Sequence, residues 1–451
     1  MVTGVLLAAL VASACGSGTS SKAQNATPTT GPNAPIDKTL GNGVTANTIK
    51  LGVALVDFKD IKPFTPYRTN AEQREIYDAF IKDINDKGGI QGRKIVPVYR
   101  FYNPVGPGGS QILTLCTVFA EDENVFAVTG TFVDFSGDAQ TCIAKQHKRV
   151  LLTFNLSQEN IDDSPPGLIV TPGNIPDRSA KILIELLKKE KTLEGKQIGV
   201  LGDTTESAVV NKTIVPQLKR AGVAVGTVAL LSIGGTNPDT TTPQAQLDSF
   251  IEKWKQDKIA ALFLSGDLAS TKQFVQKVKT ALPNLVLVAD NTDVLGQARD
   301  LQKAKVKPNP YEGIITAGGL TPKEYDASQN WKYCADIYHK QTGKVAENAE
   351  QTKKDKDGYI NDTYGAINDA CQLLSMFHDI GERVGRYLND ANWVYAVDHF
   401  GKITNRGTGP YSTLHAGKYS ADDNWRLQKY DSTVGESGNW VPITPLQNIS
   451  G

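Results

Sequence analysis

The chain has 451 residues, with 48 basic and 48 acidic side chains, 40% hydrophobic residues and five cysteines. At about 150 residues per domain, this length indicates two or three globular units, and the apolar content excludes a disordered or fibrous protein. Zero net charge without a basic block argues against a nucleic-acid partner. No apolar run after residue 15 approaches the roughly 18 residues that a membrane-spanning helix needs.

The first fifteen residues have the pattern of an export signal. An apolar run covers residues 5–12, and the small residues 12–14 (ASA) meet the requirement of a signal peptidase, which predicts a signal peptide over residues 1–14. Small residues ahead of Cys15 resemble a bacterial lipobox, so Cys15 is predicted to be lipidated. Ordinary cleavage after Ala14 is the alternative. Residues 1–4 depart from a complete signal because they contain no Lys or Arg.

Residues 15–45 are predicted to form the lipidated cysteine and a flexible tether. They are rich in Ser, Thr, Gly, Pro and Asn and contain almost nothing apolar to bury. We therefore expect the body of the chain to be held on the extracytoplasmic face of the cell membrane by a lipid anchor.

The body alternates predicted strands with amphipathic helices, and Gly88-Gly89 ends the first of these helices. This alternation predicts parallel sheets with right-handed crossovers and helices on both faces. Because there are two such series, we predict an α/β protein of two doubly wound lobes. The first series has strands at 49–56, 95–101, 125–129 and 150–154 and helices at 71–87, 110–121 and 139–146. The second has strands at 197–201, 223–231, 260–264 and 285–289 and helices at 180–188, 209–221, 245–255 and 269–280.

Polar loops follow the carboxyl ends of the predicted strands, where open parallel sheets bind their ligands. In the first series, the loop with Thr131, Phe132, Asp134 and Ser136 joins a strand end to a helix start. Its free N–H groups and hydroxyls are suited to hold a carboxylate at the positive end of the helix dipole. The alternative is that these small polar residues only form a turn.

Acidic side chains occupy the corresponding loops of the second series. Asp203, Asp267 and Asp290 are candidates for accepting an ammonium group, and Glu206 and Asn291 lie beside them. Each is also suited to be an ordinary loop or capping residue.

Aromatic side chains are concentrated in the first-series loops. They are candidates for the wall around an apolar or aromatic ligand, with core packing as the alternative. The residues are Phe58, Phe64, Tyr102, Phe132, Phe135 and Phe154.

Removing Cys15 leaves four cysteines, an even set suited to disulfides in an oxidising compartment. Cys116 and Cys142 lie on successive predicted helices, and Cys334 and Cys371 lie on two long helices further along. We favour the pairings Cys116–Cys142 and Cys334–Cys371 among the three that are possible. Metal binding is the weaker alternative, because no zinc spacing is present and the five histidines are scattered. Free thiols are weaker still.

Six stretches of sequence carry a family resemblance. They read GVT and IKLG at 43–45 and 49–52, INDKGGIQGRKI at 84–95, VTG at 128–130, GVLGD at 199–203 and GYINDTYGA at 358–366. Together they resemble the branched-chain amino-acid-binding (leucine/isoleucine/valine) family of type I periplasmic solute-binding proteins of ABC importers. The resemblance runs from about residue 43 to about residue 420 and implies two lobes joined by a three-strand hinge.

The resemblance also implies how the chain is divided. Crossings between the lobes are expected near Thr171, Thr316 and Arg406. Lobe 1 would comprise 46–171 and 316–405, lobe 2 would comprise 172–315, and a hinge return with a lobe 2 tail would comprise 406–451.

The function implied by the resemblance is capture of a small solute by hinge closure and its delivery to ABC transporter permease subunits. The solute is expected to be an amino acid or a related amide or carboxylate. The family matches the loop of Thr131 and Ser136 with its grip on the amino-acid carboxylate and places Asn155 and Ser157 at a further contact. Residues 203–207 lack the aromatic residue of many relatives, so branched-chain specificity is not inherited.

Other functions are weighed against this one. A ligand-sensing receptor domain without transport is the alternative. An enzyme is not expected, because the chain has no GxSxG, HExxH or Walker motif. We expect a monomer that needs no cofactor and no metal.

Overall fold

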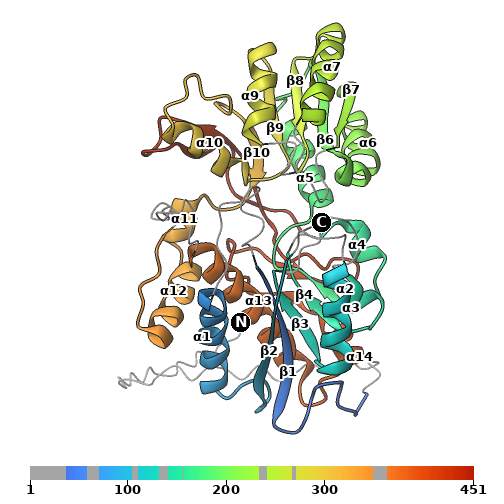
Figure 1. The fold of residues 1–451 in the computed structure, drawn as a ribbon, viewed down its shortest axis with the longest axis vertical. Helices are drawn as coiled ribbons and strands as arrows, with labels where there is room; N and C mark the ends of the chain where they lie inside the picture. The colour runs from blue at the N-terminus through green and yellow to red at the C-terminus, as the bar shows by residue number, and fades with distance from the viewer. Residues whose placement is uncertain are drawn as a thin grey trace, which may run out of the picture. The chain divides into compact units, whose positions relative to one another are not determined.

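The computed structural model describes residues 37–57, 71–103, 110–131, 141–154, 156–232, 241–266, 271–348 and 363–450. The predicted signal, the lipidation site Cys15 and the tether up to residue 36 lie outside these ranges. Two sheets built mainly of parallel strands, each with helices packed on it, confirm the predicted fold class (Figure 1). None of the helices in the described ranges combines the length and apolar character that crossing a bilayer requires.

The first sheet is parallel throughout, with the strand order β2-β1-β3-β4-β5. Its interior strand β1 is largely apolar, and residues 51–56 of that strand are all buried. Such continuous burial is typical of a parallel strand covered on both faces. The strands are β1 (Thr48–Val56), β2 (Lys94–Tyr102), β3 (Ala127–Gly130), β4 (Val150–Leu152) and β5 (Ile169–Val170).

Helices from two distant parts of the chain cover the first sheet (Figure 1). The helix α1 ends at Asp86, and Gly89 then adopts a φ of +72° and donates its N–H to the Ile84 carbonyl at 2.9 Å, as the Gly88-Gly89 pair predicts. The early helices are α1 (Ala71–Asp86), α2 (Ser110–Thr117), the π-helical turn η2 (Val118–Asp122), α3 (Cys142–Lys145) and α4 (Gln158–Asp162). The late elements are α11 (Pro322–Asp326), α12 (Gln329–Thr342), α13 (Thr363–Val384), α14 (Asp390–Asp398), β11 (Gly401–Lys402) and β12 (Thr413–Leu414).

Two disulfides join helices of this lobe. Cys116 of α2 bonds Cys142 of α3 with a Cα–Cα distance of 6.1 Å, and Cys334 of α12 bonds Cys371 of α13 with a distance of 5.8 Å. All four cysteines are buried. The pairs are those favoured from the sequence, and each contributes about 2–4 kcal/mol by restricting the unfolded chain.

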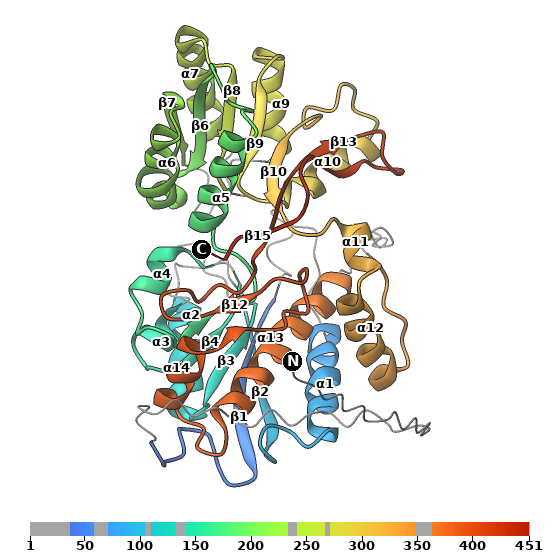
Figure 2. The ribbon, with the colours of Figure 1, turned by 180° about the vertical axis from the view of Figure 1, so that it is seen from behind.

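The second sheet has the order β14-β13-β10-β9-β8-β6-β7, with β15 paired to β13. Strands β6 to β10 are parallel, whereas β13 runs antiparallel to β10 and lies beside it at one end of the sheet (Figure 2). The strands are β6 (Gln197–Asp203), β7 (Ala224–Leu231), β8 (Ala261–Leu264), β9 (Val286–Ala289), β10 (Ile315–Gly318), β13 (Asn424–Asp431), β14 (Asn439–Pro442) and β15 (Gln447–Asn448).

Each face of the second sheet has its own apolar core. Helices α7, α9 and α10 pack on one face, where Trp254 and Phe274 are fully buried. Helices α5 and α6 and the π-helical turn η5 pack on the other face. The bounds are α5 (Pro176–Lys189), the 3₁₀ turn η4 (Thr204–Glu206), η5 (Val209–Ile214), α6 (Val215–Arg220), α7 (Thr241–Asp257), α9 (Lys272–Ala281) and α10 (Val294–Lys303).

The segment after Tyr419 extends the second sheet. It supplies β13, β14 and β15, and Trp425, Tyr430 and Trp440 of these strands are buried against the lobe. Tyr430 also packs edge-on against Trp440 with 6.5 Å between ring centroids.

Three segments connect the two sheets. The first leads from β5 to α5, the second from β10 to α11, and the third from β12 to β13. The first and third lie side by side, because the Thr171 N–H bonds the Tyr419 carbonyl and the Ala421 N–H bonds the Thr171 carbonyl, both at 2.9 Å.

A buried charge network, which we call the hinge network, surrounds the third connection. Arg178 of α5 lies 2.6 Å from Asp423, whose side chain is fully buried, and Lys418 lies 3.1 Å from the same carboxylate. Asp422 accepts a hydrogen bond from Asn174 at 2.9 Å. Burial and the nearby Arg178 lower the pKa of Lys418 to about 8, although Asp423 acts in the opposite direction. Each charge of the hinge network therefore has an oppositely charged or hydrogen-bonding partner.

Candidate functional site

Three neighbouring strands of the second sheet bring polar residues together at their carboxyl ends. Asp203 ends β6, Ser265-Gly266 follows β8, and Asp290 follows β9. Because β6, β8 and β9 are adjacent and parallel, these residues lie at one edge of the sheet. Ser265 is fully buried, Asp203 is 1% exposed and Asp290 is 6% exposed.

Gly266 is the centre of this cluster. Its N–H donates to Asp290 Oδ1 at 3.0 Å, and its φ of +75° favours glycine. A Cβ at this position would lie 2.9 Å from Cγ of Glu206 and 3.3 Å from Oε1 of the same side chain. Glu206 and Asp290 thus both contact Gly266, and a larger residue there would displace the Glu206 side chain.

The two carboxyl groups against Gly266 resist ionisation. Burial, together with the nearby carboxylates of Asp290, Asp203 and Asp177, raises the pKa of Glu206 to about 7. Burial also raises the pKa of Asp290 to about 6, although the hydrogen bond from Gly266 and the nearby Ser265 and Asn291 side chains partly offset this effect. No described cation forms an ion pair with Glu206 or Asp290, so the site concentrates negative charge without a counterion.

Several buried polar atoms at this edge lack hydrogen-bond partners among the described residues. They are Ser265 Oγ, Asp290 Oδ2 and Asn291 Nδ2, together with Gln428 Oε1 on the neighbouring part of β13. Most buried polar groups in proteins are hydrogen-bonded, so a concentration of such atoms at one edge marks a candidate binding site. We call Glu206, Ser265, Gly266, Asp290 and Asn291 the second-lobe rim.

Asp203, by contrast, has a structural task. Its Oδ1 accepts hydrogen bonds from the Thr205 N–H at 2.8 Å and from the Thr205 hydroxyl at 2.5 Å. It therefore caps the turn η4 and positions Glu206, which is the last residue of that turn.

Three predicted site residues of the first lobe also have internal partners. The Tyr102 side chain is 3% exposed and its hydroxyl donates to the Thr131 carbonyl at 2.9 Å, which ties the end of β2 to the loop after β3. Ser157 caps α4, and its hydroxyl accepts from the Asn160 N–H at 3.1 Å. The remaining predicted residues, Phe58, Phe132, Asp134, Ser136, Asn155 and Asp267, lie outside the described residues.

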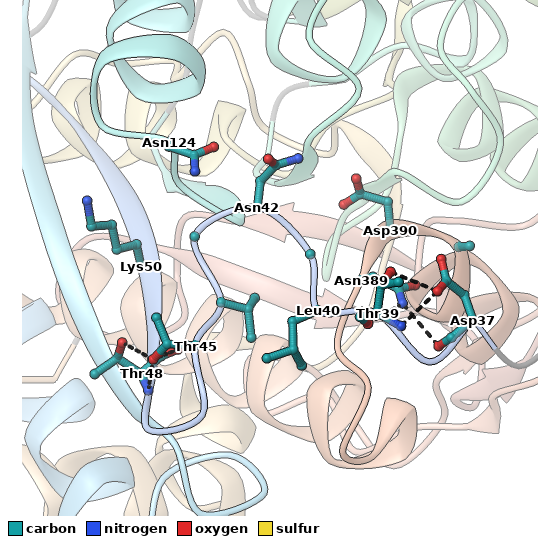
Figure 3. Close-up of a pocket in the computed structure, with 14 residues that line it drawn as sticks. Asp37, Thr39, Leu40, Asn42, Thr45, Thr48, Lys50, Asn124, Asn389 and Asp390 are labelled. Atoms are coloured by element: carbon teal, nitrogen blue, oxygen red, sulfur yellow. Dashed lines mark hydrogen bonds between the residues drawn. The ribbon is translucent and has the colours of Figure 1, made fainter.

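A separate concavity of about 710 Å³ lies at the amino-terminal edge of the first sheet, where strand β1 begins (Figure 3). Its wall includes Thr48 and Lys50, which begin β1, and the residues that precede them. The Asn389 amide donates to the Thr39 carbonyl at 2.9 Å, so this concavity marks where the segment from Asp37 packs on the start of α14. It is remote from the carboxyl ends of the strands and contains no part of the second-lobe rim.

Comparisons with known proteins identify the fold. No family model matches the chain, and no curated protein is similar to it in sequence. Solved structures are similar over almost their whole length. An ABC transporter solute-binding protein from Rhodopseudomonas palustris, in complex with 3,4-dihydroxybenzoic acid, is 14% identical, covers 90% of this chain and 98% of its own, and has a TM-score of 0.61.

Two further structures give the same result. A leucine-, isoleucine-, valine-, threonine- and alanine-binding protein from Brucella ovis is 13% identical over 89% of this chain and 95% of its own, with a TM-score of 0.62. A fatty acid ABC transporter substrate-binding protein from Thermomonospora curvata is 15% identical over 92% of this chain and 96% of its own, with a TM-score of 0.62. The chain has the type I periplasmic-binding-protein fold.

Within the type I periplasmic-binding-protein fold, sequence patterns located some residues of the second-lobe rim and missed others. Asp290, Asn291 and Glu206 were predicted because an acid or amide follows a strand. Ser265 was missed because a serine at a strand end is an ordinary loop residue. Gln428, which lies beside the second-lobe rim, was missed because only the tertiary pairing of β13 with β10 brings it to this edge.

Proposed function

We propose that the chain is the extracytoplasmic substrate-binding lipoprotein of an ABC transporter. It captures a small solute, an amino acid or a related amide or carboxylate, by hinge closure and delivers it to the permease. The observation that carries this proposal is the group of buried, unpartnered polar atoms on the second-lobe rim. A solute that enters there supplies the missing partners.

Hinge closure follows from differential binding. A ligand that contacts both lobes only in the closed form shifts the equilibrium toward that form by the difference in its affinities. The three connecting segments supply the hinge, and the permease reads the closed shape. On the first-lobe side, the loop of Thr131 and Ser136 is proposed to hold an anionic part of the solute.

The ligands named for the structural neighbours support the proposal that the first lobe holds an anionic part of the solute. Leucine, 3,4-dihydroxybenzoic acid and a fatty acid differ in size and polarity, but each carries a carboxyl group. A carboxylate held by the first-lobe loop would leave the rest of the solute to the second-lobe rim.

A thermal-shift screen followed by calorimetry tests the proposal. Amino acids, amides, aromatic acids and fatty acids are screened, and a true ligand should stabilise the protein by about 2.7 kcal/mol at a hundredfold excess over its dissociation constant. Asp290→Asn should weaken binding, whereas Glu252→Gln on the exposed side of α7 should not change it. Chemical turnover of the bound compound would contradict the proposal and favour an enzyme.

Anchoring and transport need separate measurements. Labelling with a radioactive fatty acid should mark the protein, and Cys15→Ser should abolish the label and release the protein from the membrane. Addition of the liganded protein should stimulate ATP hydrolysis by its permease complex. Binding without such stimulation would support a sensing receptor instead.

A further inference from the structure

The described α-helices on the second sheet, α5, α6, α7, α9 and α10, each have a basic residue in the last turn. The strands that follow these helices are parallel, so all five last turns lie at the amino-terminal edge of the sheet, opposite the second-lobe rim. We call residues 188–196, 219–223, 255–260, 279–285 and 303–314 the basic edge. Its last-turn basic residues are Lys188, Lys189, Lys219, Arg220, Lys255, Lys279 and Lys303.

The helix dipole alone does not account for the basic edge. Basic residues do complement the negative end of a helix dipole, but this argument applies to every helix. Four helices of the first lobe, α1, α2, α4 and α14, end without Lys or Arg. Acids are few in the last turns of the basic edge, where Asp257 and Asp300 are present and Asp257 already accepts from the Thr227 N–H at 2.7 Å.

The backbone at these helix ends gives a second, independent observation. Helices α5, α6, α7 and α10 close with the same two hydrogen bonds around one residue in left-handed conformation. In α6 that residue is Gly222, with a φ of +81°, and glycine is the residue that this conformation favours. In the other three helices it is a lysine. Lys191, Lys258 and Lys305 have φ angles of +54°, +54° and +58°.

A lysine in this conformation is less stable than a glycine, because its Cβ crowds the backbone. Gly222 shows that the same helix closure forms with glycine in the same lobe. The side chains of Lys191, Lys258 and Lys305 are exposed, and none of them has a partner within the part of the chain that the structure describes. What these three positions share is therefore their charge, and strained backbone of this kind is a reason to look for a function.

The dimensions of the basic edge favour an extended partner. It runs along the starts of strands β10, β9, β8, β6 and β7, which are four inter-strand steps or about 19 Å. A small anion can contact only one or two lysines over that distance, whereas a chain of negative charges can contact all of them. Lysine also presents a compact point charge without the fixed fork of arginine, so it suits recognition by charge rather than by shape.

The path of the chain favours a polymer over the bilayer surface. The described chain begins at Asp37 and packs on the first lobe, where the Asn389 amide donates to the Asp37 carbonyl at 3.3 Å. The lipid anchor proposed above would therefore be connected to the first lobe, whereas the basic edge belongs to the second.

We propose that the basic edge binds a linear polyanion, a polymer with a negative charge on each repeating unit. This surface is separate from the second-lobe rim and adds an interaction that solute capture does not need. The extracytoplasmic location proposed above would make the polymer a component of the cell envelope, and only that step rests on the proposed function.

Linear polyphosphate is the probe, and the Cys15→Ser protein, which carries no lipid, is used for calorimetry. We expect binding that weakens as salt rises, because each neutralised phosphate releases a counterion. The triple variant Lys191→Gly, Lys258→Gly, Lys305→Gly should lower the affinity about tenfold. It should also reduce the slope of log affinity against log salt by about 2. Its melting temperature should not fall, because glycine fits the left-handed backbone.

Lys148 provides the matched control. It is exposed and has a φ of +51°, but it lies in the first lobe and outside the basic edge. Lys148→Gly should therefore leave polyphosphate binding unchanged. Absence of polyphosphate binding, an unchanged affinity in the triple variant, or an equal loss in Lys148→Gly would overturn the proposal. Tighter binding to phosphatidylglycerol vesicles than to polyphosphate of equal charge would overturn it in favour of a membrane surface. None of these results changes the thermal-shift screen, so the proposed function is tested separately.

Discussion

The hinge network and the second-lobe rim are both buried and both charged, but they are built in opposite ways. In the hinge network Asp423 faces Arg178 and Lys418, so buried charges of opposite sign meet. On the second-lobe rim Glu206 and Asp290 face other acids, and burial raises the pKa of both carboxyl groups. The oppositely charged pairs of the hinge network maintain the fold, whereas the acids of the second-lobe rim have no described counterion and are available to a ligand.

The difference also predicts opposite contributions to stability. Removing one member of a buried ion pair leaves the other charge without a partner, which is strongly destabilising. Removing an acid that its neighbours repel relieves the folded state, and binding sites commonly carry such a cost. Four experiments test this comparison, and they are ordered by expected effect.

The largest effect is expected from Arg178→Met. It leaves the fully buried Asp423 with Lys418 as its one cationic partner among the described residues, and it removes the hydrogen bonds of Arg178 to the carbonyls of Asp422 and Ile449. The free energy of unfolding, measured with urea, should fall by about 3–5 kcal/mol. Lys181→Met on the exposed side of α5 is the control. A loss no larger than that of the control would mean that the hinge network is not structural.

Glu206→Gln should act in the opposite direction. The folded state keeps the Glu206 proton up to about pH 7, whereas the unfolded chain loses it near 4.5, so the wild-type free energy of unfolding should fall as pH rises between these values. Glutamine removes this dependence and should raise stability at pH 8 by about 1–3 kcal/mol while weakening ligand binding. Urea unfolding of both proteins at pH 5 and pH 8 measures the pH dependence of the wild type and the stability gained by the variant. A variant less stable than the wild type at pH 8 would contradict the prediction.

Glu324→Gln should lower the free energy of unfolding by a smaller amount, and only at pH values where Glu324 of the wild type is ionised. Burial tends to raise the pKa of Glu324, but hydrogen bonds from Arg426 and Thr321 outweigh it and hold the pKa at about 2. Ionised Glu324 stabilises the folded protein above pH 4.5, and this stabilisation is lost as pH falls toward 2. Because the Glu324 side chain is 44% exposed, solvent screening limits the loss to about 1 kcal/mol. When unfolding is measured at pH 6 and pH 3, the free energy of unfolding should fall less on acidification in the variant than in the wild type.

The smallest effect is expected for the pair Lys212–Glu159. Its side chains are 70% and 51% exposed, and exposed ion pairs contribute about 0.2–1 kcal/mol at most. A double-mutant cycle with Lys212→Met and Glu159→Gln should give a coupling energy near the lower limit, reduced further by salt. A larger coupling would show that this pair, like the hinge network, holds elements together.

The parallel sheets were predictable because buried parallel strands are almost continuously apolar and helices repeat between them. The segment β1 and the stop at Gly88-Gly89 show how local patterns determine local structure. The antiparallel strands β13 to β15 were not predictable in the same way, because their pairing depends on a distant strand, β10. For the same reason the sequence located Asp290 but did not reveal that Gly266 would bring Glu206 against it.

The segment that begins at Asp37 enters the folded body at the amino-terminal edge of the first sheet, where Asn389 donates to its carbonyls (Figure 3). Asn392 also donates to the Asp37 carbonyl. Loops that bind ligands in such a sheet lie at the other edge. A surface chip or a fluorescent dye attached at Asp37 would therefore be positioned away from those loops. Binding rates measured on protein immobilised in that way should match those of the free protein.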